Sequence, residues 1–255
     1  MHSSDGLHWS FRSMVRDPAS AISGAVNSGD ENALLRLGDG RLMMVMRYDY
    51  ADFIPSRDPY HAPNVGGLIQ VFSRDDGHTW QGAAVLNGTS HPAPGYPGGH
   101  PHNVEPKMAR LPALGLIVLS SGRCGQYVWW ANESDVVAGK QGPLWRSIDI
   151  RAHHNAAIGP HRSAWRFEGN CAESTAYTNL NVLGDPERAT EVVVVYDKTH
   201  IEVPKTLPKG DEVNYLFSVR LSFGRGGQGT AGDARASKHD DDSARVSVDW
   251  TRCDA

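Results

Sequence analysis

The sequence predicts an all-β protein assembled from short antiparallel strands. Apolar segments recur at short intervals and are bounded by Gly, Pro, Asn or Asp. No stretch keeps an apolar period of 3.6 residues for three turns, so we expect almost no helix. The 255 residues also include 27 Gly and 15 Pro, as expected where many turns separate short strands.

The strand candidates are segments rich in β-branched and large apolar residues. Those at 42–46, 116–119 and 192–196 are too short and too continuously apolar for surface helices, so they are expected to be buried inner strands. All candidates, in chain order, are 33–37, 42–46, 67–72, 107–111, 115–120, 126–131, 164–168, 176–182, 192–196 and 215–222.

Composition excludes several classes of protein. Hydrophobic residues make up 40% of the chain, enough for a substantial core. The net charge of −4 without a basic block excludes the usual footprint of a nucleic-acid binder. No apolar run approaches the ~18 residues of a membrane span, and we identify no secretory signal at the start. The three scattered cysteines indicate neither a disulfide framework nor a compartment, so the localisation stays open.

Residues 223–244 differ from the rest of the chain. They are small, polar and charged, a composition that buries too little apolar surface to offset the entropy of ordering. We therefore predict a main β domain over 1–222, a disordered segment over 223–244, and a final strand and tail over 245–255.

One turn motif recurs. The fixed positions of Ser-x-Asp-x-Gly-x-Thr-Trp are all matched at 73–80, with a shorter echo at 3–9 and a fainter one that ends at Trp145. Asp and Ser can accept hydrogen bonds from turn amides, Gly takes a positive φ, and Trp covers the hairpin. We therefore predict a structural turn, made by Ser73, Asp75, Gly77, Thr79 and Trp80.

This motif is the Asp box, and the chain resembles the sialidase (neuraminidase) superfamily of β-propellers. Trp9, Trp80 and Trp145 lie 71 and 65 residues apart, which suits successive four-stranded blades with long loops. The resemblance extends from about residue 3 to about 222. It implies a partial six-bladed propeller, with three to four blades present.

Three further segments carry the resemblance. The segment from Glu31 to Arg47 looks like the family segment in which a Glu opens one strand, an Asp-Gly turn follows, and an Arg ends the next strand. The hairpin would bring Glu31 and Arg47 to one end of the sheet. Arg123 follows a strongly apolar strand, and Tyr177 lies in a segment similar to the one that holds the family's nucleophile.

The resemblance implies a retaining exo-α-sialidase that acts on terminal sialic acids or a related sugar acid. Sialidases are the tyrosine-nucleophile exception among glycosidases. Tyr177 would then be the nucleophile and Glu31 would accept its proton, while Arg47 and Arg123 would bind the substrate carboxylate. No cofactor is expected. The alternative is a non-catalytic propeller that binds glycan or protein, and mutual geometry of Tyr177 and Glu31 discriminates between the two.

The chain departs from the family pattern in two respects. Nothing in 1–30 resembles the family's first arginine or its acid/base aspartate. We therefore expect the C-terminal portion of a sialidase, either a truncated product or a relic, which associates with a missing N-terminal half. General acid catalysis is typically worth ~10²–10⁴-fold, so the chain alone should hydrolyse a sialoside very poorly.

The histidines are not expected to bind a metal. They lack cysteines or carboxylates at ligand spacing, and His153, His154 and Asn155 are interpreted as a loop near the mouth of the site. The pattern G-x-G-x-x-G at 224–229 lacks a following helix and is interpreted as low complexity.

Overall fold

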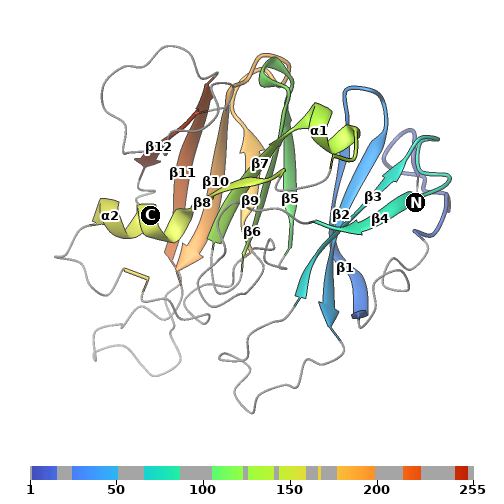
Figure 1. Cartoon of the computed structure of the whole chain (residues 1–255), viewed down its shortest axis with the longest axis horizontal. Coiled ribbons are helices and arrows are strands. Elements are labelled where there is room, and N and C mark those ends of the chain that lie inside the picture. Colours follow the sequence, from blue (N-terminus) through green and yellow to red (C-terminus); the bar gives the residue numbers. More distant parts are fainter. Residues whose placement is uncertain are drawn as a thin grey trace.

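The computed structural model contains three four-stranded antiparallel sheets (Figure 1). It describes residues 2–15, 25–50, 66–86, 105–122, 126–140, 144–158, 166–167, 177–198, 215–224 and 245–251. Among these residues the strands are accompanied by a pair of short α-helices, and neither helix is long and apolar enough to cross a membrane. The all-β prediction is therefore confirmed.

Each sheet is a meander in which neighbours in the chain are neighbours in space. The first sheet contains β1 (Ala25–Arg36), β2 (Leu42–Tyr50), β3 (Gly66–Ser73) and β4 (Gln81–Val85). The second contains β5 (Lys107–Leu111), β6 (Leu116–Gly122), β7 (Gln126–Asn132) and β8 (Arg146–Asp149). The third contains β9 (Asn179–Val182), β10 (Glu191–Lys198), β11 (Tyr215–Gly224) and β12 (Arg245–Thr251).

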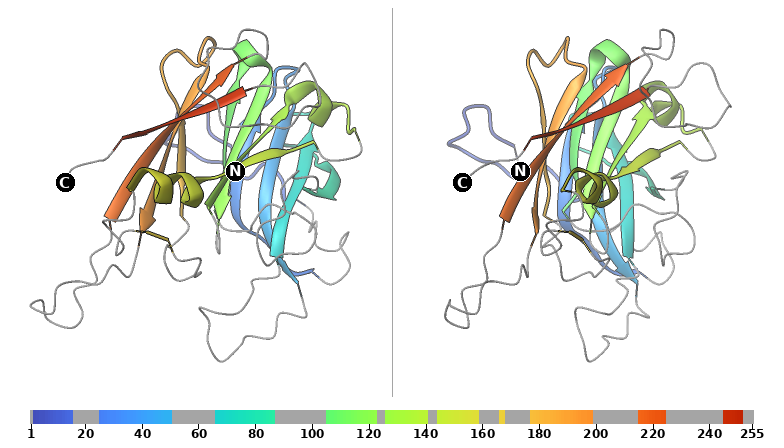
Figure 2. Two further views of the ribbon diagram at one scale, coloured as in Figure 1. Left: turned by 60° about the vertical axis from the view of Figure 1, so that its left-hand side comes forward. Right: turned by 90° about the vertical axis from the view of Figure 1, so that its left-hand side faces the viewer.

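The first strands of the three sheets lie side by side. β5 contacts both β1 and β9, and the sheets follow one another in chain order (Figures 1 and 2). Antiparallel sheets of four strands, set side by side through their first strands, are the blades of a propeller. The described residues thus form a partial β-propeller with three blades.

Tight turns set the strand register. Between β1 and β2 the Gly40 amide donates to the Leu37 carbonyl oxygen at 3.0 Å, and Gly40 has a φ of +88° that other residues rarely adopt. The strands leave this turn with Arg36 opposite Leu42 and Asn32 opposite Met46. The predicted Asp-Gly hairpin is confirmed, although β1 begins earlier than the predicted segment 33–37.

The middle sheet is buried on both faces. Along β6, Ile117 and Leu119 belong to the core shared with the first sheet, whereas Leu116 and Val118 belong to the core shared with the third. Alternation along a strand explains this division, because successive side chains point to opposite faces. The continuous apolar run at 116–119 is therefore a strand between two sheets, as predicted.

Asp box residues 73–80 connect β3 to β4. The Gly77 amide donates to Ser73 Oγ at 2.8 Å, and the Thr79 amide donates to Asp75 Oδ1 at 2.8 Å. The Thr79 hydroxyl also donates to Asp75 Oδ2 at 2.6 Å, and this hydrogen bond, followed by that of the Thr79 amide, lowers the pKa of Asp75 to about 2. The Asp75 carboxylate thus organises a turn at the outer side of the first sheet.

The echo at residues 3–9 makes the same hydrogen bonds. The Gly6 amide donates to Ser3 Oγ and the His8 amide to Asp5 Oδ1, both at 2.8 Å. His2 and Ser10 form an antiparallel bridge that closes this N-terminal hairpin. At the third echo, a short helix α1 (Glu133–Val137) stands where the box would be, before the buried Trp145.

A second helix, α2 (Ile150–Ile158), corrects the prediction of a loop at residues 153–155. Asp149 starts it by accepting the amides of Arg151 and Ala152 at 2.9 and 3.2 Å, as an N-terminal cap does. The helix has fewer than three turns, too short to show a sustained apolar period in the sequence. The predicted end of the main β domain at residue 222 falls inside a strand, because β11 extends to Gly224.

The middle sheet should tolerate little loss of volume. We expect Leu119→Ala to lower the free energy of unfolding by about 2–5 kcal/mol, because Leu119 is fully buried and the cavity would not collapse. Leu216→Ala is the matched control, since Leu216 is 62% exposed on β11 and its truncation should cost less than about 0.5 kcal/mol. Urea denaturation of both variants measures the difference, and equal costs would contradict this account of the core.

Asp75 should make stability depend on pH. Its folded pKa of about 2 lies below the ordinary value of 3.8, so its contribution is present above pH ~4 and is lost as pH falls towards 2. We expect Asp75→Asn to lack this component of the acid dependence. Melting temperatures of the two proteins between pH 5 and pH 2 test this, and parallel curves would refute it.

Candidate functional site

Glu31 and Arg47 form an ion pair on the first sheet. Arg47 Nη1 donates to Glu31 Oε2 at 3.4 Å, from β2 to the neighbouring β1. Both side chains are largely covered, with exposed fractions of 17% for Glu31 and 18% for Arg47. The hairpin register, with Asn32 opposite Met46, brings the two residues together.

Tyr177 reaches this pair from the third sheet. Its hydroxyl donates to Glu31 Oε1 at 3.0 Å, across 146 positions of sequence. Tyr177 precedes β9, and the neighbouring Thr178 is buried and hydrogen-bonded to Ser120 of β6 at 3.0 Å. Tyr177 remains 45% exposed, so part of this residue is accessible from the surface.

Glu105 completes the site and was missed in the sequence. It precedes β5, and its main-chain amide donates to Glu31 Oε2 at 2.7 Å. Its own carboxylate accepts from Lys107 Nζ at 2.7 Å. The signal in the sequence is weak, a Glu-Pro pair before an apolar strand, and a contact made by the main chain leaves no side-chain pattern.

The residues of the site come from, or lie just before, strands at the place where the three sheets meet. Residues 105 and 177 stand just before the first strands β5 and β9, while Glu31 lies on β1, the first strand of its own sheet. Since β1, β5 and β9 are neighbours, their approach gathers the Glu31 carboxylate and the Arg47 guanidinium of the first sheet, the Glu105 amide that precedes the second, and the Tyr177 phenol that precedes the third. Glu31 is the common partner of the others.

This arrangement can move a proton. The phenol of Tyr177 already donates to a carboxylate oxygen, so transfer of that proton would leave a phenolate beside the acid that received it. The second oxygen of Glu31 accepts from Arg47 and from the Glu105 amide, which fixes the carboxylate in one orientation. The geometry therefore suits a tyrosine activated as a nucleophile by Glu31.

The other predicted site residue, Arg123, lies outside the described residues. β6 ends at Gly122, immediately before it in the chain. Its predicted role towards a substrate carboxylate stays a prediction.

His154 lies in an aromatic cluster between α2 and the third sheet. It is fully buried, and its Nδ1 lies 2.9 Å from the Tyr196 hydroxyl. The rings of Phe167 and Phe217 meet it edge-on, with centroids at 4.9 and 4.6 Å. A buried histidine in such packing joins helix to sheet, and the described residues contain no group of three potential metal ligands.

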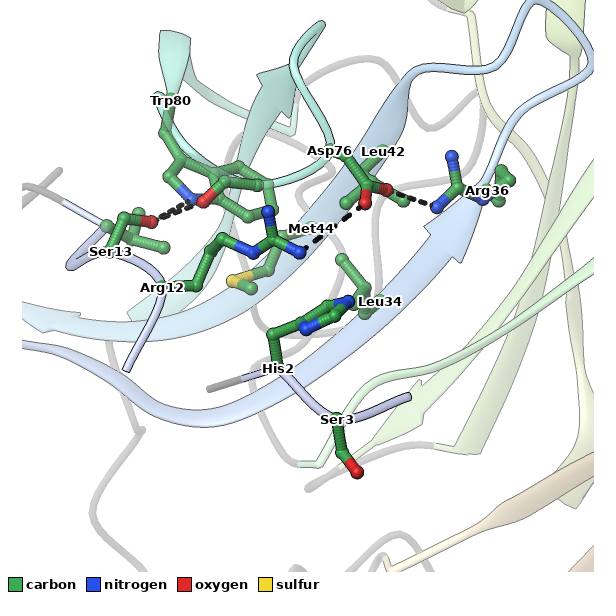
Figure 3. Close-up of a pocket in the computed structure, with 12 residues that line it drawn as sticks. His2, Ser3, Arg12, Ser13, Leu34, Arg36, Leu42, Met44, Asp76 and Trp80 are labelled. Atoms are coloured by element: carbon green, nitrogen blue, oxygen red, sulfur yellow. Dashed lines mark hydrogen bonds and ion pairs between the residues drawn. The ribbon is translucent and has the colours of Figure 1, made fainter. Parts of the chain in front are cut away.

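A pocket of about 400 Å³ lies elsewhere, between the N-terminal hairpin and the Asp box (Figure 3). Asp76 stands between Arg12 and Arg36 and forms ion pairs with both. Trp80 Nε1 donates to Ser13 Oγ at 3.3 Å on the other side. These contacts attach the N-terminal segment to the first sheet, and the lining includes neither Glu31 nor Tyr177.

The solved structures similar to this chain include a trans-sialidase and an arabinofuranosidase. No family model matches, and no curated protein matches. An intramolecular trans-sialidase from Ruminococcus gnavus is 17% identical, with a TM-score of 0.34, over 65% of this chain and 27% of its own. The α-L-arabinofuranosidase Arb93A from Fusarium graminearum is 14% identical, with a TM-score of 0.37, over 77% of this chain and 49% of its own. The chain thus spans less than half the length of either.

Proposed function

We propose that this chain carries the nucleophile half of a retaining glycoside hydrolase that acts on terminal sialic acids or related 2-keto sugar acids. One observation supports the proposal most directly, the 3.0 Å hydrogen bond from the Tyr177 hydroxyl to Glu31. A propeller that only binds glycan or protein needs no tyrosine hydroxyl hydrogen-bonded to a carboxylate. The contact therefore favours an enzyme over the non-catalytic alternative.

The substrate class follows from the choice of nucleophile. The anomeric carbon of a 2-keto sugar acid bears a carboxylate, which would repel an anionic nucleophile. A neutral phenol avoids that repulsion until the proton leaves, and sialidases use tyrosine in this way. The presence of Tyr177 at the centre of the site, beside Glu31, is thus suited to an acidic sugar.

The first step can be written with these residues. Tyr177 Oη attacks the anomeric carbon as Glu31 Oε1 takes the phenolic proton, and the bond to the leaving oxygen breaks. A covalent glycosyl-tyrosine results, and the leaving oxygen takes a proton from an acid outside the described residues. Water then attacks the anomeric carbon and gives a proton to the base form of that acid, while the bond to Tyr177 Oη breaks and Glu31 returns its proton to the phenolate. The acid is thereby restored and the configuration is retained.

Arginine supplies the charge that an acidic sugar requires. In the proposed reaction Arg47 keeps Glu31 in place through its 3.4 Å contact and, with Arg123, binds the substrate carboxylate by charge-assisted hydrogen bonds. Such contacts hold the anomeric carbon within reach of Tyr177.

A covalent trap tests the nucleophile without steady-state turnover. A sialosyl fluoride with a second fluorine beside the anomeric carbon has a good leaving group and forms a slowly hydrolysed adduct. We expect intact-protein mass spectrometry to show one adduct, and peptide mapping to place it on Tyr177. Tyr177→Phe should give none, while Glu31→Gln should slow labelling by about 10²–10⁴-fold because the proton acceptor is lost.

Tyr127→Phe is the matched control. It removes the hydroxyl of a buried tyrosine on β7 whose pKa burial raises to about 12. Labelling should persist in this variant. An adduct on any other residue, or an adduct that persists in Tyr177→Phe, would refute the proposed nucleophile.

A further inference from the structure

Glu105 lies just before the second sheet and contacts the Glu31–Tyr177 pair, whose members come from the first and third sheets. Its main-chain amide lies 2.7 Å from Glu31 Oε2, closer to the carboxylate than either Arg47 or Tyr177. Arg47 donates to the same oxygen at 3.4 Å, and Tyr177 donates to the other oxygen, Oε1. One carboxylate thus receives a donor from each sheet.

The backbone of Glu105 is held in an unfavourable conformation. Its φ is +36°, in the left-handed region that non-glycine residues rarely adopt. Among the described residues the other non-glycine position with positive φ is Asp76, at +57°, inside the Asp box turn. At Glu105 the same kind of conformation turns the amide towards Glu31.

Neighbouring residues hold Glu105 in this state. The Lys107 ammonium pairs with the Glu105 carboxylate at 2.7 Å, and Lys107 is the first residue of β5. Pro106 between them is buried, which fixes the short segment that joins Glu105 to the strand. The amide is therefore attached to a strand and loses little freedom by its contact, whereas the long Arg47 side chain loses more.

We propose that Glu105 is a positioning residue, whose main-chain amide fixes Glu31 Oε2 so that Oε1 faces the Tyr177 hydroxyl. Without this donor the carboxylate can rotate about its last bond, and Oε1 leaves the line of proton transfer. The catalytic consequence rests on the proposed function, but the contact itself does not. Through Glu105, the second sheet then controls the proton transfer from Tyr177 to Glu31, which belong to the third and first sheets.

The contact is tested by NMR of the Glu105 amide. A short hydrogen bond to a carboxylate moves the amide proton downfield, so we expect this resonance to shift upfield in Glu31→Gln, which keeps the shape and removes the charge. It should shift further in Glu31→Ala, which removes the acceptor. A Glu105 resonance that is the same in all three proteins would overturn the proposal, whatever the enzyme does.

The effect on reactivity is tested by the rate at which the difluorinated sialosyl fluoride labels Tyr177. Glu105→Pro removes the amide proton and fixes φ near −65°, so labelling should slow by about 10²-fold, the cost of misplacing a reacting group by about 1 Å. Glu105→Gly keeps the amide and accepts a positive φ, and should recover most of the rate lost in the proline variant. Equal labelling in the proline variant and the wild type would overturn the positioning role.

A control variant and two further outcomes distinguish failure of the proposed function from failure of the positioning role. Asp76→Gly makes the same change at the other strained position and should leave both the Glu105 amide resonance and Tyr177 labelling as in the wild type. If the wild type is not labelled on Tyr177, the proposed function fails while the amide resonance still decides the contact. If circular dichroism shows that Glu105→Pro does not fold, the amide resonance alone decides, through Glu31→Gln and Glu31→Ala.

Discussion

The burial of the middle sheet on both faces is the constraint on which the rest of the structure depends. Trp129 and Trp130 are consecutive on β7, yet one packs towards the first sheet and the other towards the third. An indole buries roughly 150–250 Å² of surface, so these two residues contribute much of each core. Because the first and third sheets both pack on the middle sheet, the middle sheet sets the distance and the orientation between them.

This packing also brings the candidate site together. The contacts of Glu31 with Glu105 and with Tyr177 span 74 and 146 positions of sequence. The first contact needs the first sheet packed on the second, and the other also needs the third sheet in place, so the whole site forms only in the folded chain. The hydrogen bond between the buried Ser120 and Thr178 ties the Tyr177 segment to the middle sheet. The candidate site therefore exists only where the three sheets pack together, and no single sheet contains all of it.

Sequence patterns predicted what is local or carried by side chains. The approach of Glu31 and Arg47 follows from one Asp-Gly hairpin, and the inner strands follow from apolar runs. The approach of Tyr177 to Glu31 was predicted from the resemblance to sialidases, because the order of the strands in such a fold determines which strand ends meet. Glu105 could not be predicted in this way, because its contribution is a main-chain amide at positive φ. Helix α2 was missed because it has fewer than three turns and its buried face, which includes His154, depends on tertiary packing; the Asp149 cap is its one local signal.

The charges of the site bear on why a neutral nucleophile is useful here. The site contains two glutamates, and each carboxylate has a cationic partner, Glu31 with Arg47 at 3.4 Å and Glu105 with Lys107 at 2.7 Å. Paired in this way, they present a weaker negative field to an acidic sugar than two unpaired carboxylates would. A carboxylate that attacked such a sugar directly would have to leave its cation and face the substrate charge. A phenol that gives its proton to an already paired carboxylate avoids both costs, and this is the physical reason for the role proposed for Tyr177.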